Sequence, residues 1–122
     1  MLLVDAANVI GSRPTGWWRD RAGAAAAFVA QLRAATAAGR LADEVTVVLE
    51  GKARRGVPAG SADGVCVLHA QGSGDDRLIE VVAESTDEHV TLVTADRALR
   101  QRAEDLGGEV VGPSWLLERL PG

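Results

Sequence analysis

The sequence predicts one α/β domain with three layers, in which helices cover both faces of a mainly parallel, five-stranded sheet. Short apolar runs that are typical of buried strands alternate along the chain with longer stretches of helical periodicity. Strands joined through helical segments pair in parallel with right-handed crossovers. The length of 122 residues is close to that of a common single domain. We therefore expect one domain over residues 1–122.

The first strand is predicted over residues 2–4, which are short, apolar and stopped by polar residues. A strand that begins the chain and ends in a carboxylate is typical of the centre of an α/β sheet. Residues 8–19 contain glycine and proline, and we expect a loop there. An alanine-rich helix follows over residues 20–38, with Asp20 as its expected cap and Gly39 as its stop.

The rest of the chain continues the alternation. Two β-branched or apolar runs predict the second and third strands, and the glycine- and arginine-bearing segment between them has no clear period. Apolar residues at helical spacing then predict two helices on either side of a fourth strand, and Pro113 suits the start of a last helix. The expected elements are strands over residues 44–49, 65–68, 90–93 and 109–111, and helices around residues 75–83 and over 95–106 and 114–120.

Acidic side chains follow four of the predicted elements. Asp5 ends the first strand, Glu50 ends the second, Asp75 and Asp76 open the helix after the third, and Asp96 lies just after the fourth. In an open parallel sheet, ligands bind beyond the carboxyl ends of the strands, where the strand order reverses. We therefore expect carboxylates from four distant segments to meet at one edge of the sheet.

Carboxylates that lie close together repel one another unless a cation neutralises them. Hard oxygen ligands favour Mg²⁺ or Mn²⁺. An ion held by a few carboxylates keeps bound water, which it activates as a nucleophile while it also stabilises a phosphoryl oxygen. The predicted site, with Asp5, Asp96 and one of Asp75 and Asp76 around the ion, therefore suits phosphodiester hydrolysis.

Each of these acids also has a purely structural interpretation. Asp75 and Asp76 stand where helix N-caps belong, and Asp96 suits the first turn of a helix. Glu50 is equally compatible with a solvated strand end. Asn8 offers an amide that can fix a phosphate or an acid, but it can also form an Asx-turn within the loop. For Asp5 the structural interpretation is weakest, because an acid at the mouth of a central strand needs partners.

Arginine and tryptophan side chains are expected on the same side of the sheet as the acids. A polyanion needs guanidinium partners there, and Trp17 or Trp18 could stack on a base. In the alternative interpretation, one tryptophan fills the core under the first helix and the arginines are solvated; Trp115 is expected in the core. The arginines concerned are Arg13, Arg19, Arg21, Arg54, Arg55, Arg77 and Arg97.

The overall charge and hydropathy exclude some classes of protein. A formal net charge of -4 argues against a protein that coats nucleic acid non-specifically, although it leaves RNA possible as a substrate. No apolar run approaches the length of a membrane span. Met1 leads directly into the first strand, so no signal peptide fits and we expect a cytoplasmic protein. A homodimer remains an open alternative to a monomer.

The motifs together resemble an NYN domain of the PIN-like nuclease superfamily, in the YacP-like branch. The matching segments are Leu3-Val-Asp5-Ala-Ala-Asn8-Val-Ile-Gly11, Val47-Val-Leu-Glu50, Gly74-Asp75-Asp76-Arg-Leu-Ile-Glu80 and Val93-Thr-Ala-Asp96, and they cover most of the chain in the right order.

The resemblance implies a Rossmann-like, PIN-like sheet with the first strand central, for which we expect the strand order 3-2-1-4-5. It also implies a metal-dependent ribonuclease with RNA as its substrate. Asp5, Asp75 or Asp76, and Asp96 would hold Mg²⁺ or Mn²⁺, Asn8 would support the first acid, and Glu50 would be peripheral. The sequence departs from relatives in having Ala6-Ala7 where a glycine and an aromatic residue are frequent, and Glu50 where an Asp is common.

Other functions remain as alternatives. A catalytically weak or inactive RNA-binding module would keep the arginines and tryptophans without a metal, and a small α/β domain whose acids are only caps would need neither. A metal-dependent phosphohydrolase of nucleotides is a further rival, but Ala7 stands where a haloacid-dehalogenase-type enzyme has its second Asp. The chain has no P-loop, and no Gly-x-Gly-x-x-Gly follows the first strand, which disfavours an ATPase or a dinucleotide enzyme.

Overall fold

A six-stranded sheet forms the middle layer of the protein in the computed structural model, which describes residues 1–41, 44–85 and 87–121. The strand order within this part of the chain is β3-β4-β2-β1-β5-β6, and every neighbouring pair is parallel except β3 with β4. The strands are β1 (Leu2–Asp5), β2 (Val45–Leu49), β3 (Gly60–Ala62), β4 (Val65–His69), β5 (Thr91–Val93) and β6 (Glu109–Val111).

The predicted topology is confirmed. With β3 set aside, the observed order is that of the five expected strands, 3-2-1-4-5, with the first strand in the centre. β1 pairs with β2 on one side and with β5 on the other. After β1, the chain forms β2, β3 and β4 on one side of β1 and then crosses to β5 on the other side. The strand order therefore reverses between β1 and β5, which is where a doubly wound sheet binds its ligands.

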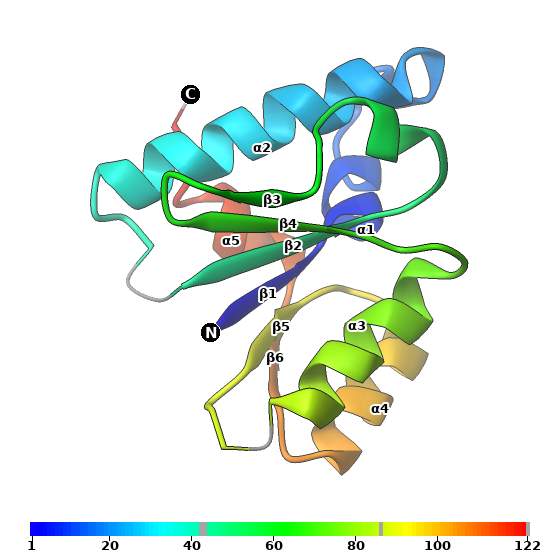
Figure 1. The fold of residues 1–122 in the computed structure, drawn as a ribbon, viewed down its shortest axis with the longest axis vertical. Coiled ribbons are helices and arrows are strands. Elements are labelled where there is room, and N and C mark those ends of the chain that lie inside the picture. Colours follow the sequence, from blue (N-terminus) through cyan, green and yellow to red (C-terminus); the bar gives the residue numbers. More distant parts are fainter. Residues whose placement is uncertain (42–43, 86, 122) are drawn as a thin grey trace.

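Helices cover both faces of the sheet (Figure 1). The long helix α2 (Arg21–Ala37) and the short helices α1 (Ala6–Gly11) and α5 (Pro113–Leu117) pack on one face, whereas α3 (Gly74–Glu84) and α4 (Arg97–Asp105) pack on the other. Alternation along β1 divides the core, because Leu2 and Val4 face the α2 layer and Leu3 faces the α3 layer. Two short 3₁₀ helices, η1 (Trp17–Arg19) and η2 (Gly51–Arg55), complete the carboxyl-end side.

Most of the expected elements are present with small changes in their bounds. Asp20 caps α2, as predicted, by accepting a hydrogen bond from the Gly23 N–H at 2.8 Å. α4 begins two residues later than expected, because Asp96 is its N-cap rather than a residue of its first turn. Trp115 packs against the core only partly buried.

Two parts of the chain predicted as loops contain regular structure. Residues 6–11 form α1, which takes in residues 8–11 of the predicted loop, with Ala6, Val9 and Ile10 buried at helical spacing. The segment after β2 contributes η2 and the edge strand β3, whose three residues are all exposed and so lack the apolar pattern of a strand.

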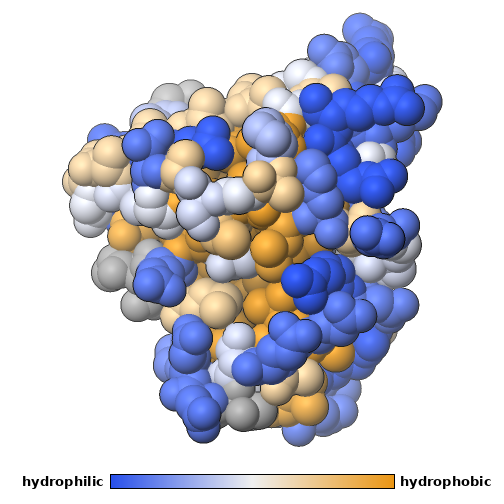
Figure 2. Space-filling model, in the orientation of Figure 1, coloured by the Kyte–Doolittle hydropathy of each residue, from blue (hydrophilic) through white to orange (hydrophobic). Residues whose placement is uncertain are grey.

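The carboxyl ends of the parallel strands form a hydrophilic edge. Figure 2 shows hydrophilic residues gathered along the right-hand side, where η2 and the N-terminal end of α3 lie in Figure 1, with hydrophobic residues visible over the middle of the sheet. Within the described residues, no helix combines the length and the apolar character needed to cross a membrane.

Candidate functional site

Asp5 lies buried at the carboxyl end of the central strand. Its side chain is 7% exposed and caps α1, accepting a hydrogen bond from the Asn8 N–H at 3.3 Å. The second carboxylate oxygen accepts a hydrogen bond from the Thr94 hydroxyl at 2.9 Å. Thr94 directly follows β5, so this bond connects the ends of β1 and β5 across the point where the strand order reverses. Asp5 therefore has donors on two sides and lies where a ligand is expected.

The Asp5 carboxyl holds its proton more tightly than an exposed one. Burial raises its pKa from 3.8 to about 6, while the bonds from Thr94 and from the Asn8 N–H partly offset that rise. The negative charges of Asp75 and Glu50 add smaller increases in the pKa. A bound cation would reverse these effects by favouring the ionised form.

Asp75 rather than Asp76 faces the other acids. Its pKa is raised by burial and by the Asp96 and Glu50 carboxylates, while the nearby Arg102 guanidinium lowers it. Asp76 is exposed and accepts hydrogen bonds from the Arg102 guanidinium of α4 at 3.4 Å. The structural interpretation of these two acids as N-caps of α3 is wrong. Ser73 is the N-cap, and both acids lie in the first turn of the helix.

Glu50 connects the end of β2 to the start of α3. One of its carboxylate oxygens accepts a hydrogen bond from the Gly74 N–H at 2.8 Å. A Cβ on residue 74 would lie 2.9 Å from the carboxylate carbon of Glu50, so only glycine fits this approach without a shift. Because Asp75 follows Gly74 directly, this bond also positions Asp75 toward the site.

Asn8 fixes the loop that carries Asp96. Its side-chain oxygen accepts a hydrogen bond from the Ala95 N–H at 2.8 Å, across 87 residues of sequence. Of the two alternatives for Asn8, the Asx-turn is wrong, because Asn8 belongs to α1 and its side chain bonds to a distant segment. Asp96 caps α4 by accepting a hydrogen bond from the Leu99 N–H at 3.0 Å, while its own N–H donates to the Thr94 hydroxyl at 3.2 Å.

The acids influence one another electrostatically, but they do not form a complete set of metal ligands. In the described ranges, no group of three or more His, Cys, Asp or Glu side chains lies close enough to hold a metal ion. The predicted trio of Asp5, Asp75 and Asp96 is thus not gathered around one point in this arrangement. The donor set is made of carboxylates alone, which suits a hard cation that keeps several waters and takes only one or two protein carboxylates.

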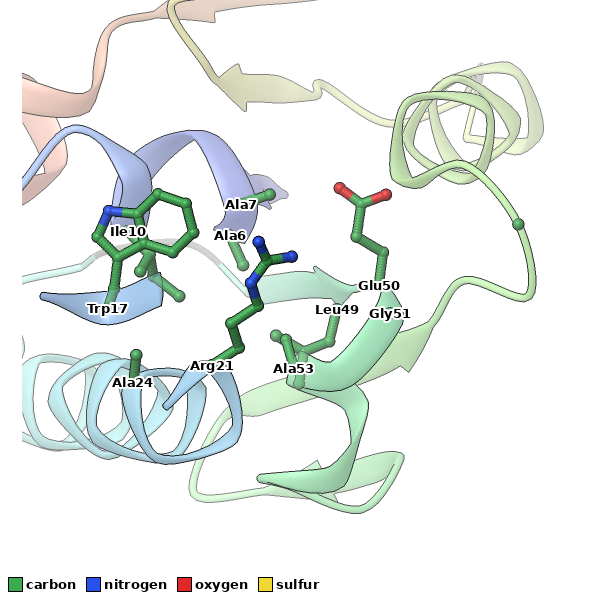
Figure 3. A pocket seen from close by; sticks show the side chains of 11 residues that line it. Ala6, Ala7, Ile10, Trp17, Arg21, Ala24, Leu49, Glu50, Gly51 and Ala53 are labelled. Atoms are coloured by element: carbon green, nitrogen blue, oxygen red, sulfur yellow. The ribbon is translucent and has the colours of Figure 1, made fainter. Parts of the chain in front are cut away.

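A pocket of about 370 Å³ opens beside the acids (Figure 3). Figure 3 shows the Trp17 indole on one side, Glu50 on the other, and the Arg21 guanidinium extending from α2 between them. Trp17 is half-buried against the core, whereas Trp18 is 55% exposed and lies outside the pocket. The lining residues are Ala6, Ala7, Ile10, Trp17, Arg21, Ala24, Leu49, Glu50, Gly51, Ala53 and Gly72.

The predicted RNA-binding arginines are dispersed. Arg54 and Arg55 are exposed on η2, where they line a second hollow together with Lys52 and His69. The others have partners elsewhere or lie exposed: Arg13 donates to the Gln31 side chain at 2.9 Å, Arg19 lies over Trp18, Arg77 pairs with Glu80 at 3.1 Å, and Arg97 is exposed at the start of α4.

Two residues of the site were not singled out from the sequence. Thr94 stands between a strand end and Asp96, where a buried acid requires a donor, and this position is the one sign of its role in the sequence. Arg21 is among the arginines expected on this side of the sheet, but its place at the start of an alanine-rich helix gives no sign of the pocket that it lines.

The comparison with solved structures identifies the fold. A crystal structure of Rae1 (YacP) from Bacillus subtilis, an NYN/PIN-like domain protein, is 19% identical, with a TM-score of 0.68 over 96% of this chain and 72% of that chain. The chain has the fold of Rae1. This PIN-like fold is the one that the sequence motifs implied. No family model matches the sequence, and neither does any curated protein.

Proposed function

We propose that the chain is a ribonuclease that hydrolyses phosphodiester bonds of RNA with the help of Mg²⁺ or Mn²⁺. The observation that carries the proposal is the buried Asp5 at the strand-order reversal, with Glu50 and Asp75 close enough to raise its pKa. A buried carboxylate with other negative charges nearby is costly unless a cation or a proton offsets it. A polar cluster of this kind at a ligand-binding edge is a candidate functional site.

Asp5 would hold the ion together with Asp75 or Asp96, directly or through its waters, with Glu50 beside them. Once bound, the ion would supply an activated water and stabilise charge on the phosphate. The protein's own part is positioning: Thr94 and the Asn8 N–H orient Asp5, the Asn8 side chain fixes the backbone next to Asp96, and Glu50 fixes the start of α3. The basic side chains of η2 lie on the same edge, where they suit phosphate groups of a bound strand.

A cleavage assay tests the proposal. Single-stranded RNA is incubated with the protein and Mn²⁺ or Mg²⁺, beside an EDTA control and the Asp5→Asn variant. We expect cleavage that EDTA abolishes and that Asp5→Asn lowers by about 100-fold or more, since even partners of metal ligands are worth 10- to 100-fold. If wild type and Asp5→Asn cut alike, the site is assigned wrongly.

The neighbouring acids of α3 give a matched pair for the same assay. Asp75→Asn removes a carboxylate that faces Asp96 and Glu50, whereas Asp76→Asn removes one that pairs with Arg102. We expect Asp75→Asn to reduce cleavage as strongly as Asp5→Asn and Asp76→Asn to leave most of it. The reverse result would assign the inner position to Asp76.

The second candidate function is RNA binding without cleavage. It is favoured by the absence, among the described residues, of three acids close enough to share an ion. In that case wild type and Asp5→Asn would bind the same RNA equally, and neither would cut it with either metal.

A further inference from the structure

We propose that the pocket between Trp17, Arg21 and Glu50 holds one unpaired base of the RNA strand, next to the point of cleavage. The inference deepens the proposed function and rests on it for the identity of the ligand. The pocket of about 370 Å³ falls within the size range of small-molecule sites. Its walls come from α1, η1, α2, η2 and the end of β2, so packed elements shape it on several sides.

The pocket adjoins the acids directly. Ala6, which lines it, is the residue after Asp5, and Glu50 both lines it and acts electrostatically on Asp5. A ligand bound here is thus next to any phosphate that reaches Asp5. In a nucleic-acid strand, the group beside a phosphate is a nucleoside.

The chemistry of the walls matches a base better than a phosphate or an alkyl chain. Trp17 offers an aromatic ring, the alanines leave space for a flat group, and Arg21 lies 5.5 Å from the centre of the Trp17 ring. Arg21 supplies donors and Glu50 supplies acceptors, which are the two kinds of partner that a base edge requires. A phosphate would be repelled by Glu50, and an alkyl chain would leave both charged groups without partners.

The basic turn that follows the pocket extends the same path. Gly51 lines both the base pocket and the hollow formed with Lys52, Arg54 and Arg55. A strand whose base enters the pocket therefore has positive side chains beside its backbone. Aromatic stacking together with a basic track is the combination by which proteins hold single strands.

Two tryptophan–arginine pairs of this chain provide a matched experiment. Arg21 lies over Trp17 in the pocket, and Arg19 lies over Trp18 outside it, 5.6 Å from the ring centre. Binding of a short single-stranded RNA is measured in EDTA, so that cleavage plays no part. We expect Trp17→Leu and Arg21→Leu each to weaken binding by about 5- to 100-fold, the range for loss of base stacking. Arg19→Leu should leave binding unchanged, and so should Trp18→Phe, which keeps an aromatic ring in contact with Trp17.

Fluorescence gives a direct readout of the pocket. The chain has three tryptophans and no tyrosine, so the double variant Trp18→Phe/Trp115→Phe leaves Trp17 as the sole indole. We expect RNA to quench its emission to saturation. The same RNA with abasic sites should bind without this quenching, and a nucleoside monophosphate should quench only at much higher concentration. A monophosphate as effective as RNA would overturn the assignment to a strand.

The proposal falls if both tryptophan–arginine pairs weaken binding alike, or if abasic RNA quenches Trp17 as fully as intact RNA. Thermal unfolding shows whether Trp17→Leu is folded, and Arg21→Leu decides the question if it is not. Quenching of the Trp17 emission by RNA without any cleavage in Mn²⁺ would support the base pocket and contradict the proposed nuclease activity. Cleavage with an unchanged KM in Arg21→Leu would overturn the pocket alone.

Discussion

The fold places the Asp5 carboxyl in surroundings that favour its protonated form. The burial that makes it available at the end of β1 also removes water from the carboxylate, and Asp75 and Glu50 add negative charge nearby. Two hydrogen bonds only partly compensate. In the protein without a bound cation, ionisation of Asp5 therefore costs free energy of folding.

This cost predicts how stability changes with pH in the absence of metal. The pKa of Asp5 is about 6 in the folded chain and 3.8 as its ordinary value. Between these values the folded chain binds a proton that the unfolded chain has lost, so the free energy of unfolding falls as the pH rises. Above about pH 6 the free energy of unfolding is lower by about 3 kcal/mol, and below pH 3.8 this loss vanishes.

The Asp5→Asn variant isolates this effect, because it cannot ionise. We expect its free energy of unfolding, relative to wild type, to increase by about 3 kcal/mol from pH 3.5 to pH 7.5 in EDTA. Urea unfolding of both proteins measures the difference, in which titrations common to the two cancel. A constant difference across this range would contradict the raised pKa.

The acids could be located from the sequence because parallel strands end at the same edge of a sheet. That rule predicts from the sequence alone that Asp5, Glu50 and Asp96 lie at this edge. It could not distinguish Asp75 from Asp76, because both lie in the first turn of α3. Only the packing of α3 against α4 brings the Arg102 guanidinium within reach of the Asp76 carboxylate. The role of Asn8 was equally hidden, because its partner Ala95 is 87 residues away.

At the level of elements, η2 packs very closely on the start of α2. A Cβ on Gly56, the residue that ends η2, would overlap the backbone carbonyl of Ala22. The two segments supply Gly51 and Ala53 from η2, and Arg21 and Ala24 from α2, to the proposed base pocket. The small size of Gly56 therefore permits the approach that forms one wall of that pocket.

Gly56→Ala should separate η2 from α2. We expect a loss of about 1–3 kcal/mol in the free energy of unfolding, as is usual for overpacking, because a backbone atom cannot rotate away as a side chain can. Gly72→Ala is the matched control, since a Cβ there meets nothing within 4 Å. Urea unfolding of both variants measures the effect. Equal stabilities would show that η2 moves freely on α2.

The short elements of the carboxyl-end side were the hardest to predict. α1 has only six residues, and the glycines and prolines after it suggested a loop, although Ala6, Val9 and Ile10 carry a helical spacing. β3 has no buried residue and is defined only by its pairing with β4. The long α2 and the buried strands were predictable because their patterns extend over more residues.

The whole molecule couples folding, protonation and the proposed ion at one point. An ion that binds only the folded chain stabilises it by mass action, by about 2.7 kcal/mol at one hundred times its dissociation constant. For a chain of 122 residues this corresponds to a rise of roughly 10 °C in Tm. Because Asp5 would be a ligand, the ion must compete with its proton, and the rise must depend on pH.

Mn²⁺ should therefore raise the Tm more at pH 7.5 than at pH 5. With a pKa of about 6, Asp5 is ionised in roughly one folded molecule in ten at pH 5, which weakens ion binding about tenfold. Thermal unfolding with Mn²⁺ or with EDTA at the two pH values measures this, and Asp76→Asn should behave as wild type. In Asp5→Asn the rise should be largely lost at both values. An equal rise in wild type and Asp5→Asn would mean that Mn²⁺ binds elsewhere, and Asp5 would then not be a metal ligand.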